Sequence, residues 1–320
     1  MDRSRLAICI SNHLHRTGTS PLSTYSIKDL EQLSGIKAHT LRIWEQRYHF
    51  IDPKRTDTNI RYYDSEDLKL ILNVALLKDN GYKISKIATL GRDKLNEIVL
   101  QLTEKNWRYP DQINALLLAM IDLNEVRFEK IVAANISKIG FESTILNVIY
   151  PFLSKIGVLW QTDAINPAQE HFVTNLIRQK MIVAFDSLPS PTQRAASKYF
   201  FYLPEGELHE LTLLFASYIV KARHNRVVYF GQNLPFDDVV TTYDIVKPEF
   251  IVTVITISPP ANQVQEYLNR LATCFPQATI LLSGYQVLSQ DLDLSANMKV
   301  FHRIEHMIDF VEANSTEIVG

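Results

Sequence analysis

Two histidines in this sequence stand where an imidazole could bind a metal or a cofactor. His209 begins a helix directly after an apolar strand at residues 199–202, so its side chain could reach a ligand over the edge of a sheet. His171 follows Glu170 in the first turns of another helix, and a nine-residue gap separates this pair from Trp160. An imidazole nitrogen is a good ligand for a transition metal, and a Trp side chain offers a large, flat apolar cover.

Each of these positions also has an ordinary structural interpretation. His209 could be a polar residue in the first turn of its helix. Trp160 could be a core residue of a helical bundle, and Glu170 could be an acid that interacts favourably with a helix N-terminus. The individual residues leave both interpretations open.

A second kind of chemistry, binding to nucleic acid, is indicated by residues 25–63. Apolar side chains recur at three-residue spacing up to Gly35, which predicts a short helix and a tight turn. A second helix follows from Lys37, and the second helix of such a helix-turn-helix enters the major groove. Six basic and three acidic residues give the segment from Lys37 to Tyr63 a net charge of +3, although the whole chain carries −2.

The residues predicted to contact DNA lie on this second helix and on a short hairpin after it. Asn59 tolerates a positive φ, so a hairpin fits there, and its Arg and Tyr side chains suit phosphate oxygens. The predicted contacts are Thr40, Arg42, Trp44, Arg47, Tyr48, Arg55, Arg61 and Tyr62. Leu41 and Trp44 share one face of the helix, so Trp44 could equally belong to the core.

The rest of the chain predicts a multidomain protein of α and α/β type. Asp64 begins a helix that Gly81 closes, and the mixed, charged residues 94–109 predict a linker. Residues 110–190 are helical with short loops, which predicts an antiparallel four-helix bundle. Strands and helices alternate over residues 196–320, which predicts a Rossmann-like (flavodoxin-like) parallel sheet that binds ligands at the carboxyl ends of its strands.

Composition limits the possible classes of protein. The 320 residues are enough for two or three domains, and no apolar run is long enough to predict a membrane span. Cys9 and Cys274 lie far apart without metal-ligand spacing, which indicates a reducing compartment, here the cytoplasm. Residues 1–20 lack the layout of a signal peptide and are expected to form an arm or an added helix before a DNA-binding domain at 21–93. No catalytic residues are predicted, because no Ser/His/Asp or metal-cluster pattern is found.

The motifs of the DNA-binding segment occur in a specific order. TLRIWEQRY at residues 40–48 is followed by P-x-R at 53–55, R-Y-Y at 61–63 and a helix beginning at Asp64. In this order they resemble the winged helix-turn-helix domain of the MerR family of transcription regulators, from residue 24 to about residue 90. The resemblance is closest to the branch that carries a cobalamin-binding domain and regulates carotenoid or light-response genes. The chain departs from the family pattern at two positions where a Gly is usual, His49 and Asn59.

The resemblance gives the two histidines specific roles. Regulators of this branch carry Trp, a nine-residue gap and Glu-His, which Trp160, Glu170 and His171 match. These side chains are then expected above a corrin ring, where His171 could become the upper cobalt ligand after light breaks the cobalt–carbon bond. His209 is expected to be the lower axial cobalt ligand, two residues after the acid Glu207.

The rest of the cobalamin motif is partly eroded. The family pattern continues with Gly, Ser-x-Leu and Gly-Gly, and the corresponding residues here are Thr212, then Thr253 and Ile255, then Ser283 and Gly284. Thr212 adds a branched side chain near the displaced lower base, and Ser283 replaces a Gly that lines the slot for the nucleotide tail. Overpacking of a tight slot costs roughly 1–3 kcal/mol, so binding could survive weakened or be lost. The persistence of the axial and bundle residues favours retained binding.

The resemblance therefore implies a regulator that binds double-stranded DNA as a homo-oligomer, a dimer or a tetramer. A pseudo-palindromic operator would match two-fold protein symmetry. Adenosylcobalamin, with or without light, would switch the assembly state and operator binding. Two alternatives remain: a MerR-type regulator that has lost cobalamin and responds to another ligand or a protein partner, and a cobalamin-carrying enzyme module, which the helix-turn-helix disfavours.

Overall fold

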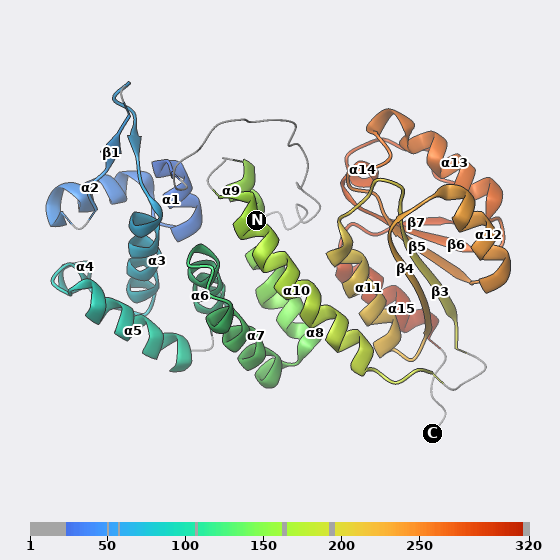
Figure 1. The fold of residues 1–320 in the computed structure, drawn as a ribbon, viewed down its shortest axis with the longest axis horizontal. Coiled ribbons are helices and arrows are strands. Elements are labelled where there is room, and N and C mark those ends of the chain that lie inside the picture. The colour runs from blue at the N-terminus through green and yellow to red at the C-terminus, as the bar shows by residue number, and fades with distance from the viewer. Residues whose placement is uncertain are drawn as a thin grey trace. The chain divides into compact units, whose positions relative to one another are not determined.

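A computed structural model describes residues 24–49, 51–56, 58–105, 108–161, 165–191 and 196–315. The described residues fall into two compact units, the first ending at Leu176 and the second beginning at Ile177. This boundary lies inside one continuous helix, α10 (Pro167–Ser187), so each unit contains part of that helix (Figure 1). The predicted arm at residues 1–20 lies outside the described residues.

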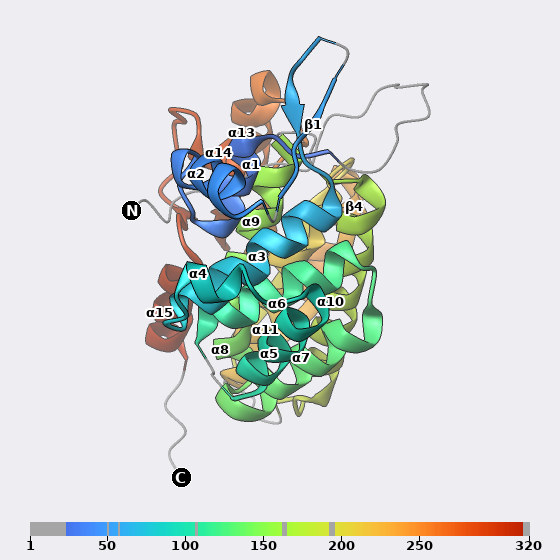
Figure 2. The same ribbon diagram turned by 90° about the vertical axis from the view of Figure 1, so that its left-hand side faces the viewer.

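The first unit is mainly helical. Its elements before α10 are α1 (Ile27–Ser34), α2 (Ala38–Tyr48), β1 (Lys54–Arg55), β2 (Arg61–Tyr62), α3 (Ser65–Asp79), α4 (Ile84–Ile87), α5 (Arg92–Lys105), α6 (Tyr109–Ile121), α7 (Glu125–Ile139), α8 (Phe141–Thr144), a π-helical turn (Ile145–Ile149) and α9 (Tyr150–Gln161). The predicted helix-turn-helix, hairpin and bundle helices are confirmed. The hairpin β1–β2 projects beyond α1 and α2 (Figure 2).

Capping chemistry sets where these helices begin and end. Ser26 and Asp64 each accept the backbone N–H three residues later, and the acid at that position bonds back, which forms a capping box for α1 and for α3. Gly35 ends α1 at φ 73°, a left-handed conformation that glycine adopts without steric cost. The turn between α1 and α2 is therefore built into the local sequence.

The prediction of a linker at residues 94–109 is wrong for most of its length, because residues up to Lys105 form α5. Leu95 and Val99 are buried, and α5 packs against α3. The charged residues of this segment cover the outer side of an amphipathic helix, which hid its apolar stripe.

The second unit contains a five-stranded sheet with every strand pair parallel, as predicted. Its elements after α10 are β3 (Lys198–Pro204), α11 (Glu210–Ala222), β4 (Arg226–Leu234), α12 (Phe236–Val246), β5 (Phe250–Val254), a 3₁₀ turn (Ala261–Gln263), α13 (Val264–Cys274), β6 (Thr279–Ser283), α14 (Tyr285–Leu288), β7 (Met298–Val300) and α15 (Ile304–Asn314). The strand order is β4-β3-β5-β6-β7, so the direction of strand addition reverses between β3 and β5. That switch point is where doubly wound sheets bind ligands.

Helices cover both faces of this sheet (Figure 1). One face packs Tyr199, Phe201 and Val252 under α11 and α15, and the other packs Phe200 and Ile251 under α12 and α13. Side chains on a strand point to alternate faces, and the nearly continuous apolar runs supply both faces. Within the described residues, no helix is both long enough and apolar enough to span a membrane.

Candidate functional site

The second helix of the helix-turn-helix buries one face and exposes basic side chains on the other. Leu41 and Trp44 are buried, and Trp44 is only 7% exposed. Of the two roles that the sequence left open for Trp44, this burial favours the core over a DNA contact: residues three apart share a helix face, and this pair faces the core. Arg42 and Arg47 are exposed, and the Arg47 guanidinium lies 5.5 Å from the centre of the Tyr48 ring.

Glu45 on this helix connects it to the hairpin. Its carboxylate accepts a hydrogen bond from the Tyr63 hydroxyl at 3.3 Å and lies 3.6 Å from Arg61 Nε. Burial, reinforced by Glu45, raises the pKa of Tyr63 to about 12, so the hydroxyl remains a donor. The Arg61 side chain is still partly exposed beside the second helix, where a phosphate could reach it.

The other predicted DNA contacts are accessible to different degrees. Thr40 and Tyr62 are half-buried, whereas Arg55 is exposed and donates to Asn59 Oδ1 at 2.7 Å. His49 and Asn59 have φ values of 52° and 64°. Both therefore adopt the conformation that favours glycine, which costs another residue roughly 1–2 kcal/mol and explains why a Gly is usual there.

In the second unit, the Glu207 carboxylate holds two loops together at the switch point of the sheet. Glu207 is fully buried in the loop after β3. Its Oε1 accepts the backbone N–H groups of Leu208 and His209, both at 3.0 Å. Its Oε2 accepts three successive N–H groups of residues 256–258, after β5, at 2.8, 2.7 and 3.3 Å. Burial alone would raise the pKa of Glu207, but hydrogen bonds from the His209 ring and the backbone lower it to about 2.

The same carboxylate orients the His209 imidazole. His209 Nδ1 is hydrogen-bonded to Glu207 Oε1, and because Glu207 is ionised, Nδ1 carries the proton of the neutral ring. Nε2 then keeps its lone pair, as in the carboxylate–histidine arrangement of many metal sites. The His209 side chain is 16% exposed. It offers a single nitrogen, so a metal bound here must bring its other ligands with it.

Glu210, directly after His209, is fixed by a second network that sequence reasoning missed. Its carboxylate lies 2.5 Å from Arg178 Nε on α10 and accepts the Tyr229 hydroxyl at 2.9 Å. The Tyr229 ring packs against Phe185, also on α10. This network attaches the C-terminal half of α10 to the helix turn that carries His209. This network could not be recognised in the sequence, because Arg178, Glu210 and Tyr229 lie far apart and form no motif of defined spacing.

Thr253, one of the predicted cofactor-binding residues, carries a buried hydroxyl group. It lies two residues after Ile251 on β5 and two residues before Ile255, which directly follows the strand, so all three lie on the sheet face covered by α12 and α13. Among the described residues, its fully buried hydroxyl has no hydrogen-bond partner of good geometry. Its neighbour on β3 is Tyr202, whose hydroxyl pairs with the Tyr267 hydroxyl at 2.8 Å.

The other residues of the eroded motif have structural contacts of their own. Gly284 has φ 107°, and an added Cβ would lie 2.4 Å from the backbone oxygen of Ile255, so only glycine fits. The Ile255 side chain is in the core, and Ser283 Oγ donates to the Phe301 carbonyl at 2.9 Å. Thr212 is half-buried on α11, one turn after the axial position. The contact of these residues with a nucleotide tail stays a prediction.

The bundle residues lie in the first unit. Glu170 is buried in the first turn of α10, and the adjacent His171 ring is 68% exposed. His171 Nδ1 lies 3.3 Å from Glu170 Oε2. Trp160 belongs to α9, and its side chain lies outside the described part of the chain.

The arrangement at the switch point fits a cobalamin in two respects. His209 Nε2 is available as an axial ligand, and cobalamin carries the four equatorial nitrogens that the protein does not supply. The buried Thr253 hydroxyl, which lies beside the Tyr202 hydroxyl, could also hydrogen-bond a polar group of the nucleotide tail.

Two segments of the chain match known protein families. Residues 25–94 match the family described as "MerR HTH family regulatory protein". Residues 112–184 match the family described as "B12 binding domain". The first match covers the helix-turn-helix and hairpin, and the second covers the helices that include Trp160, Glu170 and His171.

Two curated relatives match this chain over about two thirds or more of its length. The chain is 24% identical to the HTH-type transcriptional repressor CarH of Myxococcus xanthus over 265 residues, which is 79% of this chain and 86% of that protein. It is 28% identical to the HTH-type transcriptional repressor CarA of the same organism over 218 residues, 66% of this chain and 69% of that protein. A solved structure of the Methanosarcina barkeri monomethylamine corrinoid protein covers 68% of this chain and 99% of its own, with a TM-score of 0.50 and 12% identity. That likeness concerns the fold alone.

Proposed function

We propose that this chain, which carries a MerR-type helix-turn-helix domain and a B12-binding domain, is a cobalamin-sensing transcriptional regulator. The observation that carries the cobalamin part is the buried Glu207–His209 pair, which leaves one imidazole nitrogen available at the switch point of a Rossmann-like sheet. The likeness to CarH and CarA over about two thirds or more of the chain supports the regulatory part.

In this proposal the helix-turn-helix binds double-stranded DNA. Arg42 and Arg47 would approach the major groove from α2, and Arg61 would contact phosphate from the hairpin. Glu45 holds the hairpin against α2, so the groove and backbone contacts are made by one rigid surface. A homo-oligomer on a pseudo-palindromic operator is the assembly that we infer, since two-fold symmetry doubles these contacts.

Within the second unit, each residue of the site has a separate task. Glu207 keeps the proton on His209 Nδ1 and so directs Nε2 to the metal. The Arg178–Glu210–Tyr229 network holds the helix turn that carries His209. When bound, the cofactor supplies a cobalt ion that accepts the imidazole lone pair and a cobalt–carbon bond that light can break. We infer adenosylcobalamin as the form sensed, with His171 as the residue that meets its upper side.

The cofactor regulates only if it binds one assembly state more tightly than another. A tenfold preference corresponds to about 1.4 kcal/mol, which is enough to change the population of two states that are close in free energy. Light would act by removing the group that makes this preference. Size-exclusion chromatography of the loaded protein before and after illumination measures that step directly.

The central experiment is a spectrum. Purified full-length protein is mixed with adenosylcobalamin in the dark and desalted, and the visible absorbance of the protein fraction is recorded. We expect colour that travels with the protein. His209→Ala should weaken binding at least about tenfold and change the spectrum, because an axial nitrogen is lost. His306→Ala, which changes an exposed His on α15 of the same unit, is the matched control and should leave both unchanged.

A colourless wild-type fraction would contradict cobalamin sensing and leave a MerR-type regulator that responds to another ligand or a protein partner. A spectrum that is identical for wild type and His209→Ala would remove His209 as the axial ligand. The remaining alternative, a cobalamin-carrying enzyme module, rests on fold likeness to corrinoid proteins. It leaves the basic surface of the helix-turn-helix without a role.

A further inference from the structure

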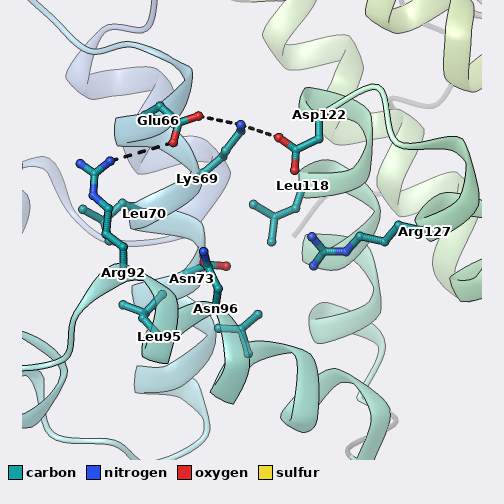
Figure 3. A pocket seen from close by; sticks show the side chains of 11 residues that line it. Glu66, Lys69, Leu70, Asn73, Arg92, Leu95, Asn96, Leu118, Asp122 and Arg127 are labelled. Atoms are coloured by element: carbon teal, nitrogen blue, oxygen red, sulfur yellow. Dashed lines mark hydrogen bonds and ion pairs between the residues drawn. The ribbon is translucent and has the colours of Figure 1, made fainter.

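A pocket of about 400 Å³ lies in the first unit, away from both sites described above. It is lined by side chains of the DNA-binding helices α3 and α5 and of the bundle helices α6 and α7, as Figure 3 shows. The volume is within the range of about 300–1,000 Å³ that is usual for small-molecule sites. Neither the proposed DNA binding nor the proposed cobalamin binding involves this pocket.

The upper rim of the pocket carries basic side chains that are already paired. Lys69 on α3 binds Glu66 at 2.7 Å and also binds Asp122 at the end of α6. Arg92 lies 4.0 Å from Glu66. These interactions join the DNA-binding helices to the bundle across the rim. Because Lys69 and Arg92 are paired with carboxylates in this way, they offer little positive charge to a ligand at this rim of the pocket.

Arg127 on α7 is different. Its guanidinium is directed toward the interior of the pocket (Figure 3), and among the described residues no hydrogen bond or ion pair of its side chain is found. Burial lowers the pKa of Arg127, and Asp122 opposes this effect, but a guanidinium stays charged in proteins. A half-buried cation with no ion-pair partner is stabilised by an anion that enters the pocket.

A second unsatisfied group lines the same pocket. Asn73 on α3 is 5% exposed and donates to Asn96 Oδ1 at 2.9 Å. Its own Oδ1 is buried and has no hydrogen-bond partner among the described residues. Leaving such an acceptor unpaired costs about 1–3 kcal/mol, and a donor on a ligand would recover this. Leu70, Leu95 and Leu118 supply apolar surface to the pocket.

We propose that this pocket binds a small organic monoanion with an apolar body and one hydrogen-bond donor. The anionic group would bind Arg127, and the donor would bind Asn73 Oδ1. Leu70, Arg92 and Leu95 also line a neighbouring hollow of about 330 Å³ that reaches His49, the residue that ends α2. The ligand would therefore contact helices that position the DNA-reading helix, and this input is separate from cobalamin.

The test uses 4-hydroxybenzoate, which has a carboxylate, a phenol donor and an apolar ring. Isothermal titration calorimetry is performed on the full chain without cobalamin. Two comparison compounds each lack one feature: 4-hydroxybenzamide has no charge, and benzoate has no hydroxyl donor. We expect saturable binding of 4-hydroxybenzoate, at least about tenfold weaker binding of the uncharged amide, and weaker binding of benzoate.

Variants then locate the binding site. Arg127→Gln should weaken binding of 4-hydroxybenzoate at least about tenfold. Asn73→Leu should make 4-hydroxybenzoate and benzoate bind equally, because the acceptor that distinguishes them is gone. Lys138→Gln removes a positive charge from the exposed side of the same helix α7 and should leave binding unchanged.

Three results would overturn the proposal: no saturable heat up to about 10 mM of 4-hydroxybenzoate, equal affinity for 4-hydroxybenzoate and the uncharged 4-hydroxybenzamide, or wild-type affinity in Arg127→Gln. The comparison of compounds needs no variant, so the proposal can fail even if a substitution disturbs folding. Because no cobalamin is present, the outcome is independent of the proposed function.

Discussion

His209 and His171 each lie beside a glutamate, but the two pairs differ in what holds the acid and in how much solvent the ring meets. Glu207 is fully buried and accepts five backbone N–H groups in addition to the His209 ring. Glu170 is also buried, and its carboxylate lies 3.3 Å from His171 Nδ1. The His209 side chain is 16% exposed, whereas the His171 side chain is 68% exposed.

This difference separates a preorganised ligand from an adaptable one. The His209 ring is fixed in one tautomer and one orientation before any metal arrives, so binding costs little reorganisation. The exposed His171 ring can turn without breaking a buried network. A histidine that has to change its hydrogen-bond or metal partner when the protein switches is better suited to an exposed environment such as that of His171. The presence of an acid next to a His in the sequence does not distinguish the two cases.

The largest effect should come from removing the anchor of the first pair. Glu207→Ala leaves the N–H groups of residues 256–258 without their acceptor, and each buried unpaired donor costs about 1–3 kcal/mol. We expect the local stability of this loop to fall by more than about 3 kcal/mol. Hydrogen-exchange mass spectrometry should then show exchange at residues 255–260 that is more than about 100-fold faster.

Glu205→Ala is the matched control for this change. Glu205 is exposed two residues earlier on the same loop, and its side chain makes no described hydrogen bond, so its loss should change stability by less than about 0.5 kcal/mol. If Glu205→Ala and Glu207→Ala gave the same exchange rates, Glu207 would not be the anchor of the two loops.

The second prediction concerns pH and the same carboxylate. The pKa of Glu207 is about 2 in the folded protein against an ordinary value of 4.5, so its stabilising contribution is complete above about pH 4.5 and is lost between there and pH 2. The contribution is on the order of 3 kcal/mol. At pH 3 about 2 kcal/mol of this contribution is lost, so between pH 6 and pH 3 the Tm of the wild type should fall further than that of Glu207→Gln, by roughly 4–8 °C. Equal falls would mean that Glu207 titrates normally.

A smaller effect is expected from the network on α10. Arg178→Met leaves the buried Glu210 carboxylate with the Tyr229 hydroxyl alone. Because Arg178 is itself partly exposed, the cost should be about 1–2 kcal/mol, below that for a fully buried pair. Exchange in the first turn of α11 should be roughly tenfold faster, whereas Gln179→Met, an exposed neighbour, should leave it unchanged. Unchanged exchange in Arg178→Met would show that α10 is not held through Glu210.

The sequence predicted most of the fold because helix and strand periods were strong. Gly35, the capping residue Asp64 and the alternating strands and helices after residue 196 placed the main elements correctly. The failures have physical causes. α5 was missed because its charged outer face dominated a short apolar stripe. Trp44 could not be assigned from the sequence, because the face that it shares with Leu41 allowed both a core role and a DNA contact, and only the burial of that face in three dimensions favours the core.

The candidate site was predictable only in part. The spacing of Glu207 and His209 was visible, but the five backbone donors around Glu207 come from two loops about fifty residues apart and have no side-chain signature. Gly284 could be identified as important, yet its reason is the nearby backbone of Ile255, which becomes apparent only in three dimensions. The Arg127–Asn73 pocket was missed for the same reason, since its helices are separated in sequence.

The smallest effect should come from the exposed histidine. His171→Ala, measured without cobalamin, should change the free energy of unfolding by less than about 0.5 kcal/mol, because its ring is mostly in solvent. His209→Ala should cost about 1–2 kcal/mol, because the hydrogen bond to the buried Glu207 is lost. Thermal unfolding of the two variants side by side measures the difference. If His171→Ala proved as destabilising as His209→Ala, the exposed ring would have a structural role. If His171→Ala leaves the free energy of unfolding unchanged, any change that this variant causes in the spectrum of illuminated, cobalamin-loaded protein can be assigned to the cofactor and not to a disturbed fold.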